Sequence, residues 1–167
     1  MSESSAKQLA GFLGRYDPKV AAVARAALTK IRRRVPGAVE LVYDNYNALV
    51  IGFGPTERAS DAILSIALYP RWVNLFFLRG ASLPDPQGLL EGEGARVRHV
   101  VLKDAAVLDE PGVRRLISQA REASPIAIGG RRRRLVIKSV STRQRARRPR
   151  ARARANALQP ASRSWRR

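Results

Sequence analysis

The sequence has no cysteine and a single histidine, and these absences exclude several classes of site. Without cysteine the chain has no disulfide and no thiolate-bound metal, and one histidine cannot build a His-rich metal centre. The lack of disulfides fits a reducing compartment. We predict no metal site; any metal would have to be held by the hard oxygen ligands of Asp and Glu.

Long apolar runs are also missing. No run approaches the roughly 18 residues of a membrane-spanning helix. The N-terminal sequence MSESSAKQLAGFLGRY lacks a basic segment followed by an apolar one, so we expect no signal peptide. We therefore expect a soluble, cytoplasmic protein without a membrane partner. A chain of 167 residues is expected to make one domain with its own core.

Acidic residues are absent after position 122, which makes the charge distribution uneven. Residues 1–123 hold 17 Lys or Arg and 13 Asp or Glu, a net +4, whereas residues 124–167 hold 15 Lys or Arg and no acid, a net +15. Beyond Thr142 the composition buries too little apolar surface to offset chain entropy. We predict a folded domain over 1–142 and a disordered Arg-rich tail over 143–167.

Helical patterns lie near both ends of the predicted domain. Asp17-Pro18 indicates a helix start, with Asp as N-cap and Pro at the first position, and apolar residues follow at helical spacing over 20–31. Asp109 is expected to cap a final helix, whose buried stripe lies over 113–120.

Strand-like segments lie between these helices. Five of them fall at 39–44, 49–53, 63–69, 72–78 and 97–102, and a sixth follows the last helix at 135–140. No helix-length segment separates the first five, so neighbouring strands should pair antiparallel. The pattern predicts an α+β fold, with an antiparallel sheet of about five to six strands packed against N-terminal and C-terminal helices.

Two glycines, Gly92 and Gly94, flank Glu93 just before a predicted strand. A phosphate loop needs a third glycine and a following helix, and Glu93 would repel a phosphate. We interpret this stretch as a turn that leads the chain into the sheet.

Five side chains are candidates for a ligand pocket: Tyr43, Asn45 and Tyr46 at a predicted hairpin tip, and Arg98 and His99 on a later strand. The alternative for the hairpin is ordinary turn chemistry, and the alternative for His99 is a buried, hydrogen-bonded histidine. If exposed in a pocket, His99 could act as a base. No nucleophile motif accompanies it, so we predict no catalytic residue.

The predicted tail has the strongest charge signal in the chain. Its arginines can contact phosphate without reading sequence, which predicts nonspecific binding of nucleic acid or another polyanion. Trp165 could add one stacking platform. The alternative is a solvated extension with incidental affinity. The candidate residues are Arg143, Arg145, Arg147, Arg148, Arg150, Arg152 and Arg154.

A series of short motifs between Pro36 and Val100 resembles the YdhG-like domain-of-unknown-function family. In order they are Pro36-Gly-Ala-x-Glu40, Val42-Tyr-Asp-x-Tyr-Asn47, Ile51-Gly-Phe-Gly-Pro-Thr56, Leu83-x-Asp-Pro86, Leu89-Leu-Glu-Gly-x-Gly94 and Val97-Arg-His-Val100. The resemblance covers roughly residues 5–142. It implies a compact α+β fold, with N-terminal helices, an antiparallel sheet and a helix after it.

The same resemblance implies a relation in shape to frataxin-like proteins, and some relatives are described as iron chaperones. Frataxin-like iron delivery depends on an acidic surface, whereas residues 6–34 here hold eight basic residues and one acid. The family supplies no established catalytic residues to transfer to this chain.

Three functions remain open at this point. The first is a non-enzymatic domain that binds a small ligand or a protein, with a tail that binds nucleic acid. The second is an iron chaperone, with iron as the only cofactor and at least three clustered carboxylates as its requirement. The third is an enzyme that uses His99 with Arg98 and Tyr43 or Tyr46.

Overall fold

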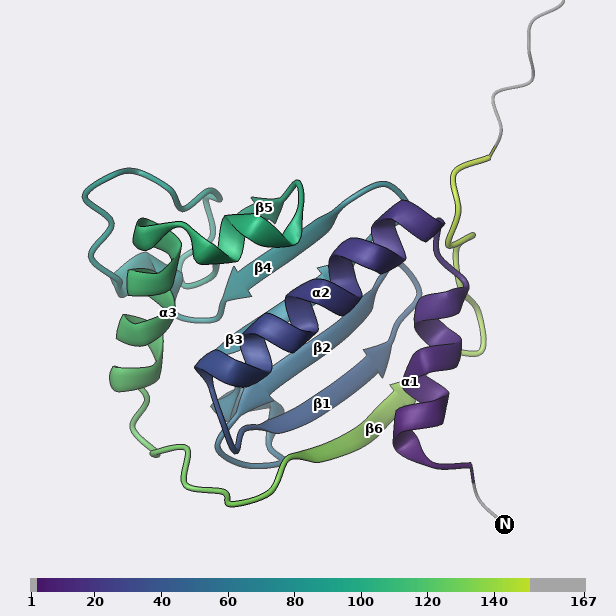
Figure 1. The fold of residues 1–167 in the computed structure, drawn as a ribbon, viewed down its shortest axis with the longest axis horizontal. Coiled ribbons are helices and arrows are strands. Elements are labelled where there is room, and N and C mark those ends of the chain that lie inside the picture. The colour runs from purple at the N-terminus through teal and green to yellow at the C-terminus, as the bar shows by residue number, and fades with distance from the viewer. Residues whose placement is uncertain (1–2, 151–167) are drawn as a thin grey trace, which may run out of the picture.

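The computed structural model describes residues 3–150, which form one six-stranded sheet with helices packed on it (Figure 1). The predicted α+β class is confirmed. The helices are α1 (Ser5–Gly14), α2 (Pro18–Arg34) and α3 (Pro111–Glu122), and three short 3-10 turns are η1 (Ala59–Asp61), η2 (Gly80–Ser82) and η3 (Ala105–Asp109). The strands are β1 (Val39–Asp44), β2 (Leu49–Gly54), β3 (Leu64–Leu68), β4 (Val73–Phe77), β5 (Arg98–Leu102) and β6 (Arg134–Val140).

The strand order across the sheet is β5-β4-β3-β2-β1-β6. The first five strands pair antiparallel with their neighbours, as predicted. The sixth differs, because β6 pairs parallel to β1 at the sheet edge. The chain passes through α3 between β5 and β6, and such a long connection allows it to re-enter the sheet in the parallel direction. The sheet is therefore mixed and mostly antiparallel.

One face of the sheet carries the core. A row of apolar side chains crosses five strands in register: Val42, Ile51, Ile66, Leu75 and Val100. Helix α2 lies over this face (Figure 1). Its buried side includes small residues, and these allow close approach of the helix to the sheet.

The capping predictions had mixed outcomes. Asp17 is the N-cap of α2, and its side chain accepts a hydrogen bond from the Lys19 amide at 2.9 Å. Asp109 is not the cap of α3, which begins after Glu110. Asp109 instead binds Lys30 and Arg34 at the end of α2. It therefore joins η3 to the helix that covers the sheet.

No helix in the described part of the chain is long and apolar enough to cross a membrane.

We predict that the Asp109 contacts make stability depend on pH. The hydrogen bond from Lys30, with the added charge of Arg34, lowers the pKa of the Asp109 carboxyl. Because the folded-state pKa is lowered, its stabilising contribution is complete above the unfolded pKa of about 3.9 and is lost as pH falls through the folded pKa. In urea titrations, Asp109→Asn should be less stable than the native chain at pH 7, and the difference should vanish in stronger acid.

The matched control is Glu93→Gln, which removes an exposed loop carboxylate that has no salt-bridge partner among the described residues. A destabilisation by Asp109→Asn that stayed the same down to pH 2 would show that the effect comes from packing and not from the ion pairs.

Candidate nucleic-acid interface

The most buried carboxylate of the sheet is Asp44, the last residue of β1. It belongs to a cross-strand row whose other members are apolar: Leu49, Leu68, Val73 and Leu102. Its side chain is fully buried. A charge in such surroundings is stable only with a hydrogen-bonded partner of opposite sign.

Arg147 supplies that partner from the C-terminal segment. Its Nη2 donates to Asp44 Oδ1 at 2.8 Å, and the Arg147 side chain is only 4% exposed. Arg15 contacts the other carboxylate oxygen of Asp44. Arg147 also donates to the backbone oxygens of Asn45 and Tyr46, the latter at 3.4 Å. One guanidinium thus binds the end of β1 and the turn that follows it.

Tyr16 lies beneath this guanidinium and is itself buried. Its hydroxyl donates to the Leu68 carbonyl at 3.1 Å and accepts from the Leu49 amide at 3.0 Å. Burial raises the pKa of the Tyr16 hydroxyl, so the group is neutral and can donate at physiological pH. The residue ties the α1–α2 connection to β2 and β3.

The residues around Arg147 are also held against the domain. Gln144 Nε2 donates to the Asp44 carbonyl at 3.0 Å, and Arg15 Nη1 donates to Gln144 Oε1 at 2.8 Å. Arg148 donates to the carbonyls of Arg15 and Gly14 at the end of α1, where a cation is favoured by the helix dipole. The C-terminal segment, residues 141–150, is therefore part of the fold.

The first part of the predicted tail lies on the domain. Disorder was expected from residue 143, yet 143–150 lie on the domain, so the domain extends past 142. Arg147 is unavailable to a polyanion because it is buried on Asp44. Arg143, Arg145, Arg148 and Arg150 are exposed. Arg152 and Arg154, with the rest of 151–167, lie outside the described residues.

A second buried carboxylate, Glu40, stands at the other end of β1. Arg32 binds both of its oxygens, with Nε at 2.7 Å and Nη2 at 2.9 Å. Arg133 adds a contact at 3.5 Å. Bidentate pairing of this kind is the strong form of the interaction. It links α2 and the start of β6 to the central sheet.

Most of the acidic side chains have a partner within the domain. Nine of the 13 have a hydrogen-bond or Lys/Arg partner there: Glu3, Asp17, Glu40, Asp44, Glu57, Asp61, Asp85, Asp104 and Asp109. Of the 27 Lys and Arg in residues 3–150, eight are within salt-bridge distance of an Asp or Glu. The other nineteen leave a strong positive excess on the surface.

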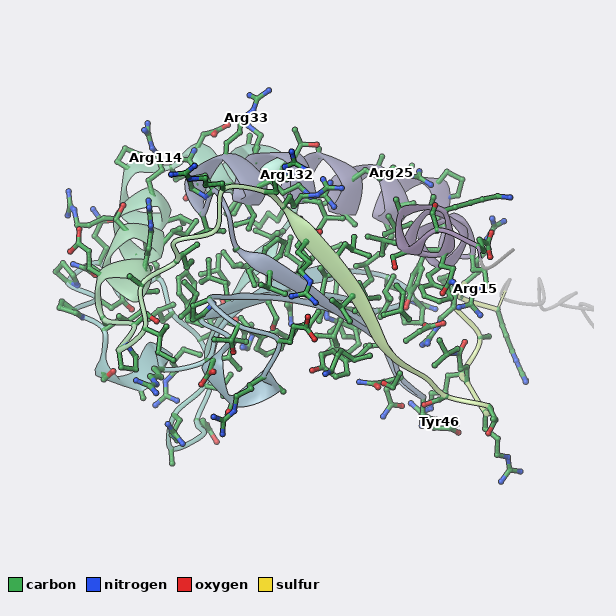
Figure 2. All side chains as sticks on the ribbon, turned by 90° about the horizontal axis from the view of Figure 1, so that it is seen from below. Arg15, Arg25, Arg33, Tyr46, Arg114 and Arg132 are labelled. Atoms are coloured by element: carbon green, nitrogen blue, oxygen red, sulfur yellow. The ribbon has the colours of Figure 1, made fainter. Side chains whose placement is uncertain are left out.

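Part of this excess gathers on the helical side of the molecule. Arg25 and Arg33 of α2, Arg132 before β6 and Arg114 of α3 lie along that side, and we call these four residues the helical basic face (Figure 2). The loop with Arg132 reaches α2 because Gly130 packs directly against Gly37, which follows the helix. Helix α2 itself has six Lys or Arg and no acid.

The five candidate pocket residues do not converge. Tyr43, Asn45 and Tyr46 lie at one end of β1, whereas Arg98 and His99 begin β5. Three strands separate β1 from β5, a distance of four strand spacings, roughly 19 Å. The two groups also lie at opposite ends of their strands, because Asp44 shares its row with Leu102.

His99 lies among neighbouring side chains of the sheet. Its ring lies 5.4 Å from that of Phe76, its Nε2 is 3.6 Å from Glu91 Oε2, and its side chain is 25% exposed. Arg98 donates to the carbonyls of Val97 and Gly94, which closes the loop before β5. The glycine-rich stretch is a turn, with Gly92 at φ +119°.

Residues 3–150 contain no group of three or more His, Cys, Asp or Glu placed to hold a metal. The iron-chaperone alternative required such a cluster of carboxylates. That alternative has no site in the part of the chain that the structure describes.

Two features of the structure were missed from the sequence. The ion pair of Asp44 and Arg147 joins residues 103 positions apart, so no local pattern reveals it. The helical basic face was overlooked because the total charge of residues 1–123 is only +4, although that charge is unevenly placed along the chain. The missing acids of α2 were the available signal.

Comparison with known proteins gives no match: no protein-family model, curated protein or solved structure is significantly similar to this chain.

We predict that Arg147→Met destabilises the domain by about 3 kcal/mol, because loss of one partner leaves a buried charge undercompensated. Arg143→Met is the matched control, since Arg143 is exposed and has no side-chain hydrogen bond or ion pair among the described residues, and its change should stay within about 0.5 kcal/mol. Urea unfolding at neutral pH measures both. Equal effects of the two substitutions would show that the buried ion pair has no special role.

The double variant Asp44→Asn with Arg147→Met should recover part of the lost stability, because no buried charge then remains on either side.

Proposed function

We propose that this protein is a non-enzymatic domain that binds nucleic acid without sequence preference, through arginine contacts to phosphate. The observation that carries the proposal is the surplus of cations that the fold leaves without an Asp or Glu within salt-bridge distance. Nineteen such side chains are present in residues 3–150.

The arrangement of charge supports a surface role. The surplus follows from the counts: residues 3–150 hold 27 Lys or Arg and 13 Asp or Glu, and the two buried acids, Glu40 and Asp44, are each neutralised by arginine. Residues 124–150 add ten basic residues and no acid. Such surfaces bind nucleic acid mainly by release of its condensed counterions, which needs no base contact.

The proposal moves the main binding surface from the predicted tail to the domain. The helical basic face is held on regular structure, whereas Arg147 of the predicted tail is used internally. Residues 151–167 add further arginines of the same chemical kind. We also propose, from the sequence motifs and composition, that the chain belongs to the YdhG-like family and is cytoplasmic.

We predict that the full chain binds a fluorescent DNA duplex with a steep salt dependence, measured by anisotropy across about 50–300 mM salt. The triple variant Arg25→Ala, Arg33→Ala and Arg132→Ala should lower the slope of log affinity against log salt by about 2.7, at about 0.9 per lost phosphate contact.

The matched control removes the same charge elsewhere, with Arg58, Arg79 and Arg96 changed to Ala; all three are exposed. If both triple variants change the slope equally, binding follows net charge and the helical basic face is not the site. If the full chain shows no salt-dependent binding, the proposed function is wrong.

A further inference from the structure

A broad groove lies at the end of the sheet where the β1–β2 and β3–β4 turns meet. It has a volume of about 810 Å³. We call it the aromatic groove, because three rings and two arginines line it: Tyr46, Tyr69, Trp72, Arg71 and Arg145. Asn45 and Asn47 are the other polar residues of its lining, which has no acid. The two turns lie next to each other because Leu49 of β2 pairs with Leu68 of β3.

Two of the rings form a stacked pair. Tyr69 and Trp72 have ring centroids 5.0 Å apart and planes inclined by 23°. Trp72 nevertheless remains 47% exposed, so Tyr69 supports the indole without covering it. Burial raises the pKa of the Tyr69 hydroxyl, so this ring adds no negative charge to the groove.

The third ring, Tyr46, is 50% exposed on the opposite turn. The Arg145 guanidinium lies 5.7 Å from its ring centroid, and the Arg145 amide donates to the Tyr46 carbonyl at 2.9 Å. The same carbonyl accepts from buried Arg147. Figure 2 shows Tyr46 at the end of the molecule reached by the C-terminal segment. The backbone that carries the ring is therefore fixed by two hydrogen bonds, and a guanidinium lies beside the ring.

Exposed rings beside arginines match the chemistry of an unpaired nucleotide. Every base has a flat face that stacks on an aromatic ring, and the adjoining phosphate needs a cation. The centres of the two turns lie two strand spacings apart, roughly 10 Å. In a duplex the faces of each internal base are covered by neighbours about 3.4 Å away, so a base stack must open before a protein ring can stack on an internal base. A duplex keeps its bases stacked and cannot do this without deformation.

We propose that the aromatic groove binds unpaired nucleotides of a single-stranded nucleic acid. Bases stack on Trp72 and Tyr46, and phosphates lie beside Arg71 and Arg145. The proposal rests on the proposed function and extends it, because it adds a preference for single strands at a second surface. A proline-rich peptide could also use exposed rings. The two arginines and the lack of acid in the groove favour the nucleic acid.

The test uses the full chain with Trp165→Phe, which leaves Trp72 as the only tryptophan. The probes are a DNA strand of about 12 nucleotides without self-complementarity and the duplex that it forms with its complement. The single strand should quench Trp72 fluorescence saturably. In anisotropy titrations, Trp72→Ala and Tyr46→Ala should each weaken single-strand binding about 5- to 150-fold, the usual effect of losing one stacked base, and leave duplex binding unchanged.

Two further variants separate stacking from general damage. Trp72→Phe should retain most single-strand affinity because it keeps a ring. Ile126→Ala, which trims another exposed apolar side chain, should change neither affinity. The groove proposal is overturned if both probes bind and the Trp72 and Tyr46 variants do not weaken the single strand selectively. Failure of both probes to bind would instead refute the proposed function. Binding of a proline-rich peptide at Trp72, with no effect of the single strand, would also overturn the groove proposal.

Discussion

The fully buried carboxylate of Asp44 is the constraint on which much of this fold depends. It stands in an otherwise apolar row of the sheet, and its charge is tolerated only because Arg147 and Arg15 bind it. Arg147 comes from 103 residues further along the chain. The need to neutralise one carboxylate therefore brings the C-terminal segment across the end of α1 and against the β1–β2 turn. The same contacts place Arg145 over Tyr46 in the aromatic groove.

The partners of the acidic side chains connect the stability of the fold to the charge of its surface. Glu40 and Asp44 hold arginines on β1, while other carboxylates cap helices and turns. The two buried carboxylates are neutralised by arginines, so the net positive charge of the domain remains on its surface. The helical basic face includes two residues of α2, a helix with six Lys or Arg and no acid. The proposed phosphate contacts and the proposed stacking groove are different surfaces of one folded unit.

Local patterns predicted what is local in this structure. The apolar spacing of 20–31 predicted α2, and the strand-like segments with short connections predicted the strands and their antiparallel neighbours. Strand order is not a local property, so the separation of His99 from Tyr43 could not be read from either segment. The composition beyond residue 142 predicted disorder because it offers little apolar surface to bury. Composition alone does not reveal that Arg147 pairs with the buried Asp44 of β1.

The most direct test of this account is the free energy of unfolding of three chains: the full chain, one ending at Arg150 and one ending at Thr142. If residues 143–150 are an integral part of the domain, the chain ending at Arg150 should match the full chain. The chain ending at Thr142 should lose about 3 kcal/mol or more, because Asp44 then keeps a buried charge without Arg147. Equal stability of all three chains would contradict the account and would return the domain boundary to residue 142.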